Sequence, residues 1–210
     1  MSVISDPAAI EKRSFEIIEE LLKDKDLKGP EKDVIMRVVH ATADPEFADN
    51  MAFSEGAAQA GISSIRSGCT VVTDVKMLRA GVSPDRPGGE VICLISDPDI
   101  ISEARKTGTT RAAAAMRRLA GSGRLDGAIV AIGNAPTALY EVMDLIRTKG
   151  VRPALVIGVP VGFVGAAESK DELLGITEAP FITCRGRKGG SPVGAAIINA
   201  LIKLSKNKPI

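Results

Sequence analysis

The chain has 210 residues, of which 45% are hydrophobic, 25% are charged and 3% are aromatic, and its formal net charge is +1. This length and hydrophobic content suffice for one domain with a sizeable core, so we expect residues 1–210 to form a single domain. The small net charge excludes a global field for binding polyanions, and the scarcity of aromatic residues argues against a stacking platform for single-stranded nucleic acid.

Two further features predict a cytoplasmic protein. No apolar run approaches the roughly 18 to 20 residues that a membrane span needs, and residues 1–18 lack the pattern of a secretory signal. The three cysteines, Cys69, Cys93 and Cys184, are too few and too scattered for a disulfide framework or a zinc site, so we expect small buried thiols. We therefore expect no membrane partner, no nucleic-acid partner and no metal site.

The first half of the chain is predicted to be mainly helical. One helix opens at Asp6-Pro7, because aspartate and proline are good start signals. Glu31–Ala43 predicts a second helix, and Glu46–Ala60 is predicted to contain a third. The apolar run Cys69–Thr73 predicts the first strand, and a short helix ending at Gly81 follows it.

Strands and helices alternate in the second half of the chain. The predicted strands are Val91–Ile95, Ala128–Ile132, Ala154–Ile157 and Phe181–Cys184, and a last helix is predicted over about Ser191–Lys206. Short continuous apolar runs of this kind are typical of buried parallel strands. Five strands that alternate with helices predict a three-layer α/β/α domain with a mainly parallel sheet.

Three of these strands end in glycine-rich loops, Gly133–Thr137, Gly158–Lys170 and Arg185–Ser191. In open α/β sheets the loops after the carboxyl ends of the strands form the ligand crevice. Glycine there permits positive φ angles and lets a ligand approach the backbone. We therefore expect the three loops to build one binding rim.

The third loop carries a basic cluster, Arg185, Arg187 and Lys188. Such a run is often only a solvated loop. Here it lies between a strand and a predicted helix start, where backbone amides, the helix dipole and guanidinium groups together favour carboxylates or phosphates. Spacing alone leaves both interpretations open. The Walker A, dinucleotide and H-E-x-x-H motifs are absent from the sequence, which argues against those nucleotide-binding and zinc-protease classes.

His40 is the only histidine of the chain, and it lies near the end of the predicted second helix. Val34, Ile35, Val38 and Val39 form the apolar face of that helix, so His40 lies at the edge of the face. A structural role would explain a lone histidine. From this edge the side chain can also reach a cleft, and imidazole is well suited to proton transfer near neutral pH.

Five segments carry a resemblance to a known family: Arg13–Ile18, Val38–Ala41, Ile132–Leu139, Pro160–Lys170 and Arg185–Ser191. They resemble the precorrin-8X methylmutases, also called precorrin isomerases, of cobalamin biosynthesis. The resemblance runs from about Ile10 to Leu201, and Pro160–Lys170 is its most specific block.

The resemblance implies a flavodoxin-like sheet and a homodimer whose active sites lie near the subunit interface. It implies migration of a methyl group from C-11 to C-12 of precorrin-8X or cobalt-precorrin-8, giving hydrogenobyrinate or cobyrinate. The reaction needs no cofactor, and cobalt enters only as part of the substrate. The family's active-site histidine corresponds to His40, which is expected to donate a proton or a strong hydrogen bond to the ring-C region.

The remaining candidates follow from the substrate that the resemblance implies, a broad apolar disc fringed by carboxylates. We expect Arg185, Arg187 and Lys188 to bind acetate or propionate groups, and the loop glycines Gly133 and Gly162 to permit close approach. Further candidates for substrate contact are Arg111, Arg66, Asn134 and Ser14, each of which has an alternative as a surface, capping or packing residue. Glu168, Lys170 and Asp74 are left out of the catalytic set, and Asp74 is expected to cap a helix.

Two other classes of function stay open at this point. A flavin- or nucleotide-binding module would share the sheet, although it should carry aromatic stacking residues that this chain lacks. A non-catalytic corrinoid carrier would bind the pigment without chemistry. The Thr42–Asp44 segment and the Thr183–Lys188 loop slightly favour the cobalt route over the metal-free route.

Overall fold

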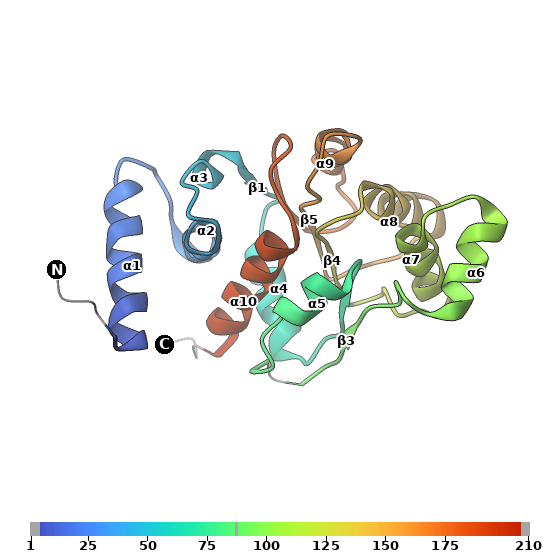
Figure 1. The fold of residues 1–210 in the computed structure, drawn as a ribbon, viewed down its shortest axis with the longest axis horizontal. Helices are drawn as coiled ribbons and strands as arrows, with labels where there is room; N and C mark the ends of the chain where they lie inside the picture. The colour runs from blue at the N-terminus through green and yellow to red at the C-terminus, as the bar shows by residue number, and fades with distance from the viewer. Residues whose placement is uncertain (1–4, 87, 207–210) are drawn as a thin grey trace.

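A computed structural model describes residues 5–86 and 88–206 and shows one mixed sheet of six strands between two helical layers (Figure 1). The strands are β1 (Met51–Phe53), β2 (Val71–Thr73), β3 (Val91–Ile92), β4 (Ile129–Ile132), β5 (Leu155–Gly158) and β6 (Phe181–Cys184). Their order across the sheet is β1-β6-β5-β4-β2-β3. The neighbours from β3 to β6 are parallel, and β1 is antiparallel to β6.

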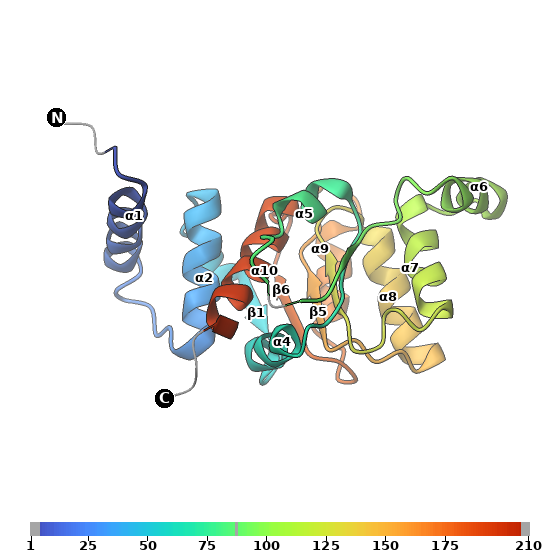
Figure 2. The ribbon, with the colours of Figure 1, turned by 90° about the horizontal axis from the view of Figure 1, so that it is seen from below.

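Helices cover both faces of the sheet, because its central strands are apolar on both sides. One layer contains α1 (Pro7–Leu21), α2 (Gly29–Thr42), α4 (Ala57–Arg66), α5 (Lys76–Gly81) and α10 (Ser191–Lys206). The other contains α6 (Pro98–Thr107), α7 (Arg111–Gly121), α8 (Pro136–Lys149) and α9 (Ala166–Leu173). Successive residues of β4 point to opposite faces: Ile129 packs in the first apolar cluster and Val130 in the second. The predicted three-layer arrangement is confirmed, and Figure 2 shows the layers from α1 at one end to α6 at the other.

The sheet has six strands, so the prediction of five was wrong. The additional strand, β1, lies inside the segment Glu46–Ala60 that was predicted to contain a helix, between α3 (Phe47–Asn50) and α4. Its pairing is not local: the N–H of Ser54 donates to the carbonyl oxygen of Phe181 at 3.0 Å. A strand of three residues leaves no periodicity to detect, and its partner strand lies about 130 residues further along the chain.

The end of α2 determines where His40 lies. The helix runs to Thr42, and Ala43 then adopts the left-handed conformation with φ 54° while its N–H donates to the carbonyl oxygen of Val39 at 2.8 Å. This is a common way for a helix to end, although glycine is the usual residue there. The chain turns from Ala43 into α3 and β1, so the last turn of α2 lies beside the antiparallel edge of the sheet.

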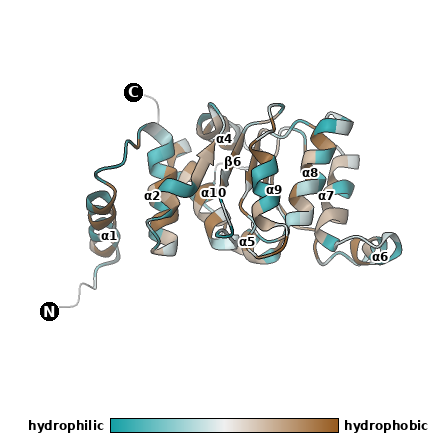
Figure 3. Ribbon diagram, turned by 90° about the horizontal axis from the view of Figure 1, so that it is seen from above, coloured by the Kyte–Doolittle hydropathy of each residue, from teal (hydrophilic) through white to brown (hydrophobic). Residues whose placement is uncertain are grey.

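The first helix, α1, lies outside α2 at the end of the molecule (Figures 1 and 2). Asp6 caps it by accepting a hydrogen bond from the N–H of Ala9 at 2.9 Å. Ile10, Ile17 and Leu21 remain exposed on it, and apolar residues are visible along this helix in the hydropathy colouring of Figure 3. Among the described residues, no helix is both long and apolar enough to cross a membrane.

Candidate active site

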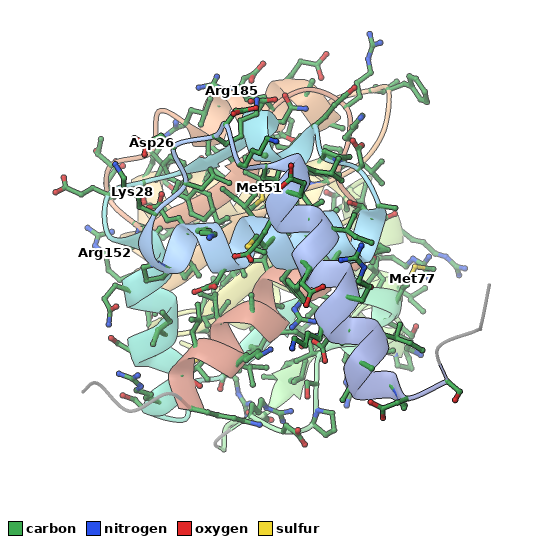
Figure 4. The ribbon with its side chains drawn as sticks, turned by 90° about the vertical axis from the view of Figure 1, so that its left-hand side faces the viewer. Asp26, Lys28, Met51, Met77, Arg152 and Arg185 are labelled. Carbon is green, nitrogen blue, oxygen red and sulfur yellow. The ribbon has the colours of Figure 1, made fainter. Side chains whose placement is uncertain are left out.

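The glycine-rich loops and the basic cluster lie at the carboxyl edge of the sheet, as predicted from the parallel strands. Arg185 follows β6 directly, and its N–H donates to the carbonyl oxygen of Asn50 at 2.7 Å, next to the start of β1. In Figure 4, Arg185 lies at the upper margin of the molecule, whereas Arg152, which precedes β5, lies at the left margin. We call the edge formed by the loops 133–137, 158–165 and 185–191 the rim.

His40 is half-buried in the last turn of α2, and its imidazole stacks on the ring of Phe15 from α1. The two ring centroids are 5.1 Å apart and the ring planes differ by only 9°. Two cations also lie over the Phe15 ring, with Arg37 Cζ at 4.7 Å and Lys203 Nζ at 5.8 Å from its centroid. Because offset stacking favours parallel rings, Phe15 holds the imidazole in a defined plane.

A carboxylate, that of Glu11, also lies beside the stacked rings of Phe15 and His40. Glu11 of α1 accepts a hydrogen bond from the Arg37 guanidinium at 2.9 Å. That hydrogen bond and the charge of Arg37 hold the pKa of Glu11 below its usual range, and Lys203 and His40 add to the effect. An ionised Glu11 therefore faces the basic groups around Phe15. Beside them, α1, α2 and α10 enclose a groove of about 380 Å³ that Phe15, Arg37 and Lys203 help to line.

The basic loop is held against the loop that follows β5. Gly162 N–H donates to the carbonyl oxygen of Arg187 at 3.2 Å, and Gly190 N–H donates to that of Val159 at 2.8 Å. The Arg187 guanidinium lies 5.7 Å from the ring centroid of Phe163, a side chain that is 84% exposed. The side chains of Arg185 and Arg187 are exposed at the rim, as required of groups that bind a ligand carboxylate.

The Lys188 side chain points toward the segment that follows α2. Its Nζ lies 2.5 Å from Asp44 Oδ2 and 2.6 Å from Glu46 Oε2, both in the segment that follows α2. The two carboxylates raise the pKa of Lys188, and Lys188 lowers the pKa of Asp44 chiefly through its hydrogen bond. Lys188 therefore joins the basic loop to the end of the His40 helix, and its ammonium group is already engaged by two carboxylates.

Asp74 has a structural role that the sequence did not reveal. It is 1% exposed, and its carboxylate accepts hydrogen bonds from three successive backbone N–H groups, those of Gly133 at 3.1 Å, Asn134 at 2.8 Å and Ala135 at 2.8 Å. Burial raises its pKa, and these hydrogen bonds oppose that effect. The expectation that Asp74 caps a helix was wrong, because Val75 occupies the cap of α5 and the Asp74 side chain anchors the loop after β4.

The two predicted glycines are needed for different reasons. A Cβ at Gly133 would lie 2.7 Å from Leu78 Cδ1 and 3.1 Å from the backbone nitrogen of Ser191, so Gly133 lets the loop after β4 pack closely against α5 and α10. Gly162 has φ 148°, which side-chain-bearing residues rarely adopt. Gly162 therefore gives its loop the conformation that meets Arg187, whereas Gly133 serves packing.

Replacing Gly133 with alanine is expected to destabilise the protein by about 1–3 kcal/mol, because the added methyl overpacks the junction with Leu78 and Ser191. Gly121 is a matched control, since a Cβ there would meet no atom within 4 Å. Gly121→Ala should be neutral or slightly stabilising. Denaturant unfolding of both variants checks the prediction, and equal stability of the two would contradict it.

The other predicted residues are dispersed. Asn134 is exposed at the rim, whereas Ser14 donates its hydroxyl to the carbonyl oxygen of Ile10 at 2.9 Å within α1. Arg111 opens α7, in the helical layer opposite to that of His40. Arg66 ends α4 ahead of β2 and donates through Nε to the carbonyl oxygen of Ser205 at 2.9 Å, at the amino edge of the sheet. The structure therefore does not bring Arg66 to the rim.

Lys170 was left out of the site and proves to contact it. It is 1% exposed, and its Nζ donates to the carbonyl oxygen of Lys188 at 2.6 Å. The buried stripe of α9 consists of Ala166, Ser169, Lys170 and Leu173. A lysine at an apolar-stripe position of a helix is a signal that helical spacing alone could have revealed.

Taken together, a mainly parallel sheet between two helical layers, with glycine-rich loops and exposed arginines at its carboxyl edge, defines an α/β protein whose rim is chemically suited to anions. Comparison with known proteins identifies the family. The model of the family described as precorrin-8X methylmutase matches residues 9–204. The chain belongs to the precorrin-8X methylmutase family and is an isomerase of cobalamin biosynthesis, which confirms the resemblance seen in the sequence.

Individual relatives agree with this assignment. The chain is 48% identical over 198 residues to a cobalt-precorrin-8 methylmutase of Priestia megaterium, covering 93% of this chain and 87% of that protein. It is 47% identical over 204 residues to the protein of the same name from Methanothermobacter thermautotrophicus, covering 96% and 95%. A crystal structure of precorrin-8x methyl mutase from Thermus thermophilus superposes with a TM-score of 0.86 at 40% identity, covering 94% of this chain and 97% of that one.

Proposed function

We propose that this isomerase moves a methyl group from C-11 to C-12 of precorrin-8X or its cobalt form, bound along the rim, with His40 as the proton donor. The observation that carries the proposal is the position of His40, held by Phe15 in the last turn of α2 and connected through Asp44, Glu46 and Lys188 to the basic loop. The products would be hydrogenobyrinate or cobyrinate.

The reaction requires two things of the protein: a proton donor and a fixed orientation of the substrate. The bond from C-11 to the methyl carbon breaks and the bond from C-12 to the same carbon forms, so the overall composition is unchanged. A proton or strong hydrogen bond from His40 to the ring-C region withdraws electron density and so favours the migration. The proton returns to the imidazole or to solvent when the product forms. No external methyl donor or redox cofactor enters this balance.

The exposed guanidinium groups of Arg185 and Arg187 are suited to the substrate's carboxylates, because arginine binds a carboxylate through two parallel hydrogen bonds. The apolar side chains beside them, Phe163 and Val164, are 84% and 90% exposed. A flat macrocycle with a charged fringe would cover these apolar side chains and reach the arginines at the same time. Asn134, exposed on the neighbouring loop, is a further carboxylate contact in this proposal.

Replacing Arg187 with alanine is expected to raise KM about 10–100-fold, since a hydrogen bond to a charged group is worth about 1.5–3 kcal/mol. Lys188→Ala should raise KM less, because Asp44 and Glu46 already hold the Lys188 ammonium. Steady-state kinetics on both variants checks the ranking. A larger rise for Lys188→Ala than for Arg187→Ala would show that the wrong cation has been assigned to the substrate.

Three finer assignments accompany this function. The parallel strands, numbered by themselves along the chain, follow the order 2-1-3-4-5, which supports a flavodoxin-like sheet with β1 added at one edge. The exposed apolar residues of α1 and of the rim support a homodimer with the active sites near its interface. The free thiols of Cys69, Cys93 and Cys184 are in keeping with the cytoplasm, a reducing compartment.

A labelled substrate tests the reaction itself. With ¹³C in the C-11 methyl group, nuclear magnetic resonance should show the label at C-12 of the product after incubation with the protein. The unlabelled methyl groups serve as internal references. Retention of the label at C-11 despite substrate binding would overturn the proposed migration and favour a corrinoid carrier.

A further inference from the structure

Lys170 occupies a position where a charge is costly. It lies in α9 at 1% exposure, and no carboxylate among the described residues forms an ion pair with it. Burial lowers the pKa of Lys170, with Cys184 and Asp171 opposing the effect. A leucine would fill the same stripe of α9 without the desolvation penalty. Packing of the helix therefore does not explain this residue.

The ammonium group is aimed at the basic loop. Lys170 Nζ donates to the backbone carbonyl oxygen of Lys188 at 2.6 Å, and the thiol of Cys184 donates to the same oxygen at 3.2 Å. Lys170 Nζ also lies 3.8 Å from Cys184 Sγ. A charged donor on a peptide carbonyl makes a stronger hydrogen bond than a neutral donor does. This carbonyl belongs to Lys188, the residue that follows Arg187.

The contacts of Lys170 complete the support of the loop. The backbone of Arg185 is held by Asn50, that of Arg187 by Gly162, and that of Gly190 by Val159. Two buried side chains, Lys170 and Cys184, donate to the carbonyl oxygen of Lys188, and Lys170 is the charged one. Since α9 begins immediately after the loop 158–165, Lys170 also couples the two loops that face each other at the rim.

We propose that Lys170 is a positioning residue: it holds the loop Arg185–Gly190 in the conformation that presents Arg185 and Arg187 to the carboxylates of the substrate. The inference rests on the proposed function of this loop. Lys170 is 1% exposed, so its proposed effect on the ligand runs through the loop and not through direct contact. Its removal should therefore weaken ligand binding through the arginines while leaving the chemistry at His40 unchanged.

The test is a set of variants, with hydrogenobyrinate titrated as the probe and turnover measured in parallel. Lys170→Met removes the ammonium but keeps the length and apolar stem of the side chain. We expect its Kd and KM to rise about tenfold, the size of one hydrogen bond to a charged group, with kcat within about twofold of the native value. Lys149→Met, at the exposed end of α8, is the matched control and should bind like the native protein.

A double-mutant cycle separates positioning from general destabilisation. If Lys170 acts through Arg187, adding Lys170→Met to Arg187→Ala should raise Kd by less than about threefold further, because coupled residues are not additive. Full additivity, or a fall in kcat with unchanged Kd, would overturn the proposal. If Lys170→Met does not fold, Lys170→Arg keeps a cationic donor and should bind within about threefold of the native protein; a Kd as high as that of Arg187→Ala would contradict the inference.

These variants also separate the proposed function of the basic loop from the positioning role of Lys170. Unchanged binding in Arg187→Ala would refute the proposed role of the loop in holding carboxylates. Weakened binding in Arg187→Ala together with native binding in Lys170→Met would refute the positioning role alone.

Discussion

Replacing His40 with alanine is expected to lower kcat by about 10²–10⁴-fold, the range typical for loss of a general acid or base. The product Kd should change little, because the arginines that we propose bind the carboxylates lie on a different element, the loop after β6. The loss in kcat is expected because His40 is the only histidine of the chain, so alanine removes the only imidazole. Phe15 holds that imidazole nearly parallel to its own ring, with the ring centroids 5.1 Å apart. Initial rates from the absorbance change, with Kd from product titration, measure both quantities.

His40→Asn provides the control for shape. Asparagine keeps a hydrogen-bond donor near the same place but cannot shuttle a proton near neutral pH, so most of the loss in kcat should remain. Native kcat in both variants would remove His40 from the mechanism. Equal loss of kcat and of product binding would instead indicate that His40 shapes the binding surface.

Replacing Asp74 with asparagine is expected to destabilise the protein by about 3 kcal/mol. The amide NH₂ would take the place of a carboxylate oxygen and face backbone N–H groups, so two donors would oppose each other where a hydrogen bond had been. Three N–H groups, those of Gly133, Asn134 and Ala135, depend on this one carboxylate. For a chain of this length the melting temperature should fall by about 6–12 °C. Calorimetry or thermal circular dichroism measures the shift.

Asp24→Asn, at an exposed position, is the control for the loss of a negative charge and should leave the melting temperature within about 2 °C. A melting temperature for Asp74→Asn equal to that of this control would mean that the loop after β4 is held by other contacts. A further expected consequence is reduced substrate affinity at temperatures where Asp74→Asn is still folded, since Asn134 lies on that loop.

The fold was largely predictable where local pattern and burial agree. β4, β5 and β6 are continuous apolar runs, and all three lie within about one residue of the predicted bounds. β1 could not be predicted, because Met51–Phe53 becomes a strand only through its pairing with β6. β3 is shorter than the predicted Val91–Ile95, since it borders only β2 at the edge of the sheet.

The position of the candidate site at the carboxyl edge could be predicted from the sequence, whereas the contacts between its side chains could not. Glycine loops after parallel strands placed Gly133, Gly162 and Arg187 at the rim, because strand direction alone determines which edge they reach. The partners of Lys188 are Asp44 and Glu46, which lie some 140 residues away in the chain, and no local pattern indicates them. Arg66 precedes a strand, and the same rule of direction would have placed it at the amino edge.

An absorbance time course shows directly whether this chain catalyses methyl migration on a corrin precursor. Purified protein would be mixed with precorrin-8X and with cobalt-precorrin-8 in parallel, because migration changes the conjugated system and therefore the spectrum. We expect a shift to a corrin spectrum with at least one of the two substrates, and the faster reaction identifies the route. Binding of both pigments without any spectral shift would contradict catalysis by this chain and indicate a protein that only carries corrinoids.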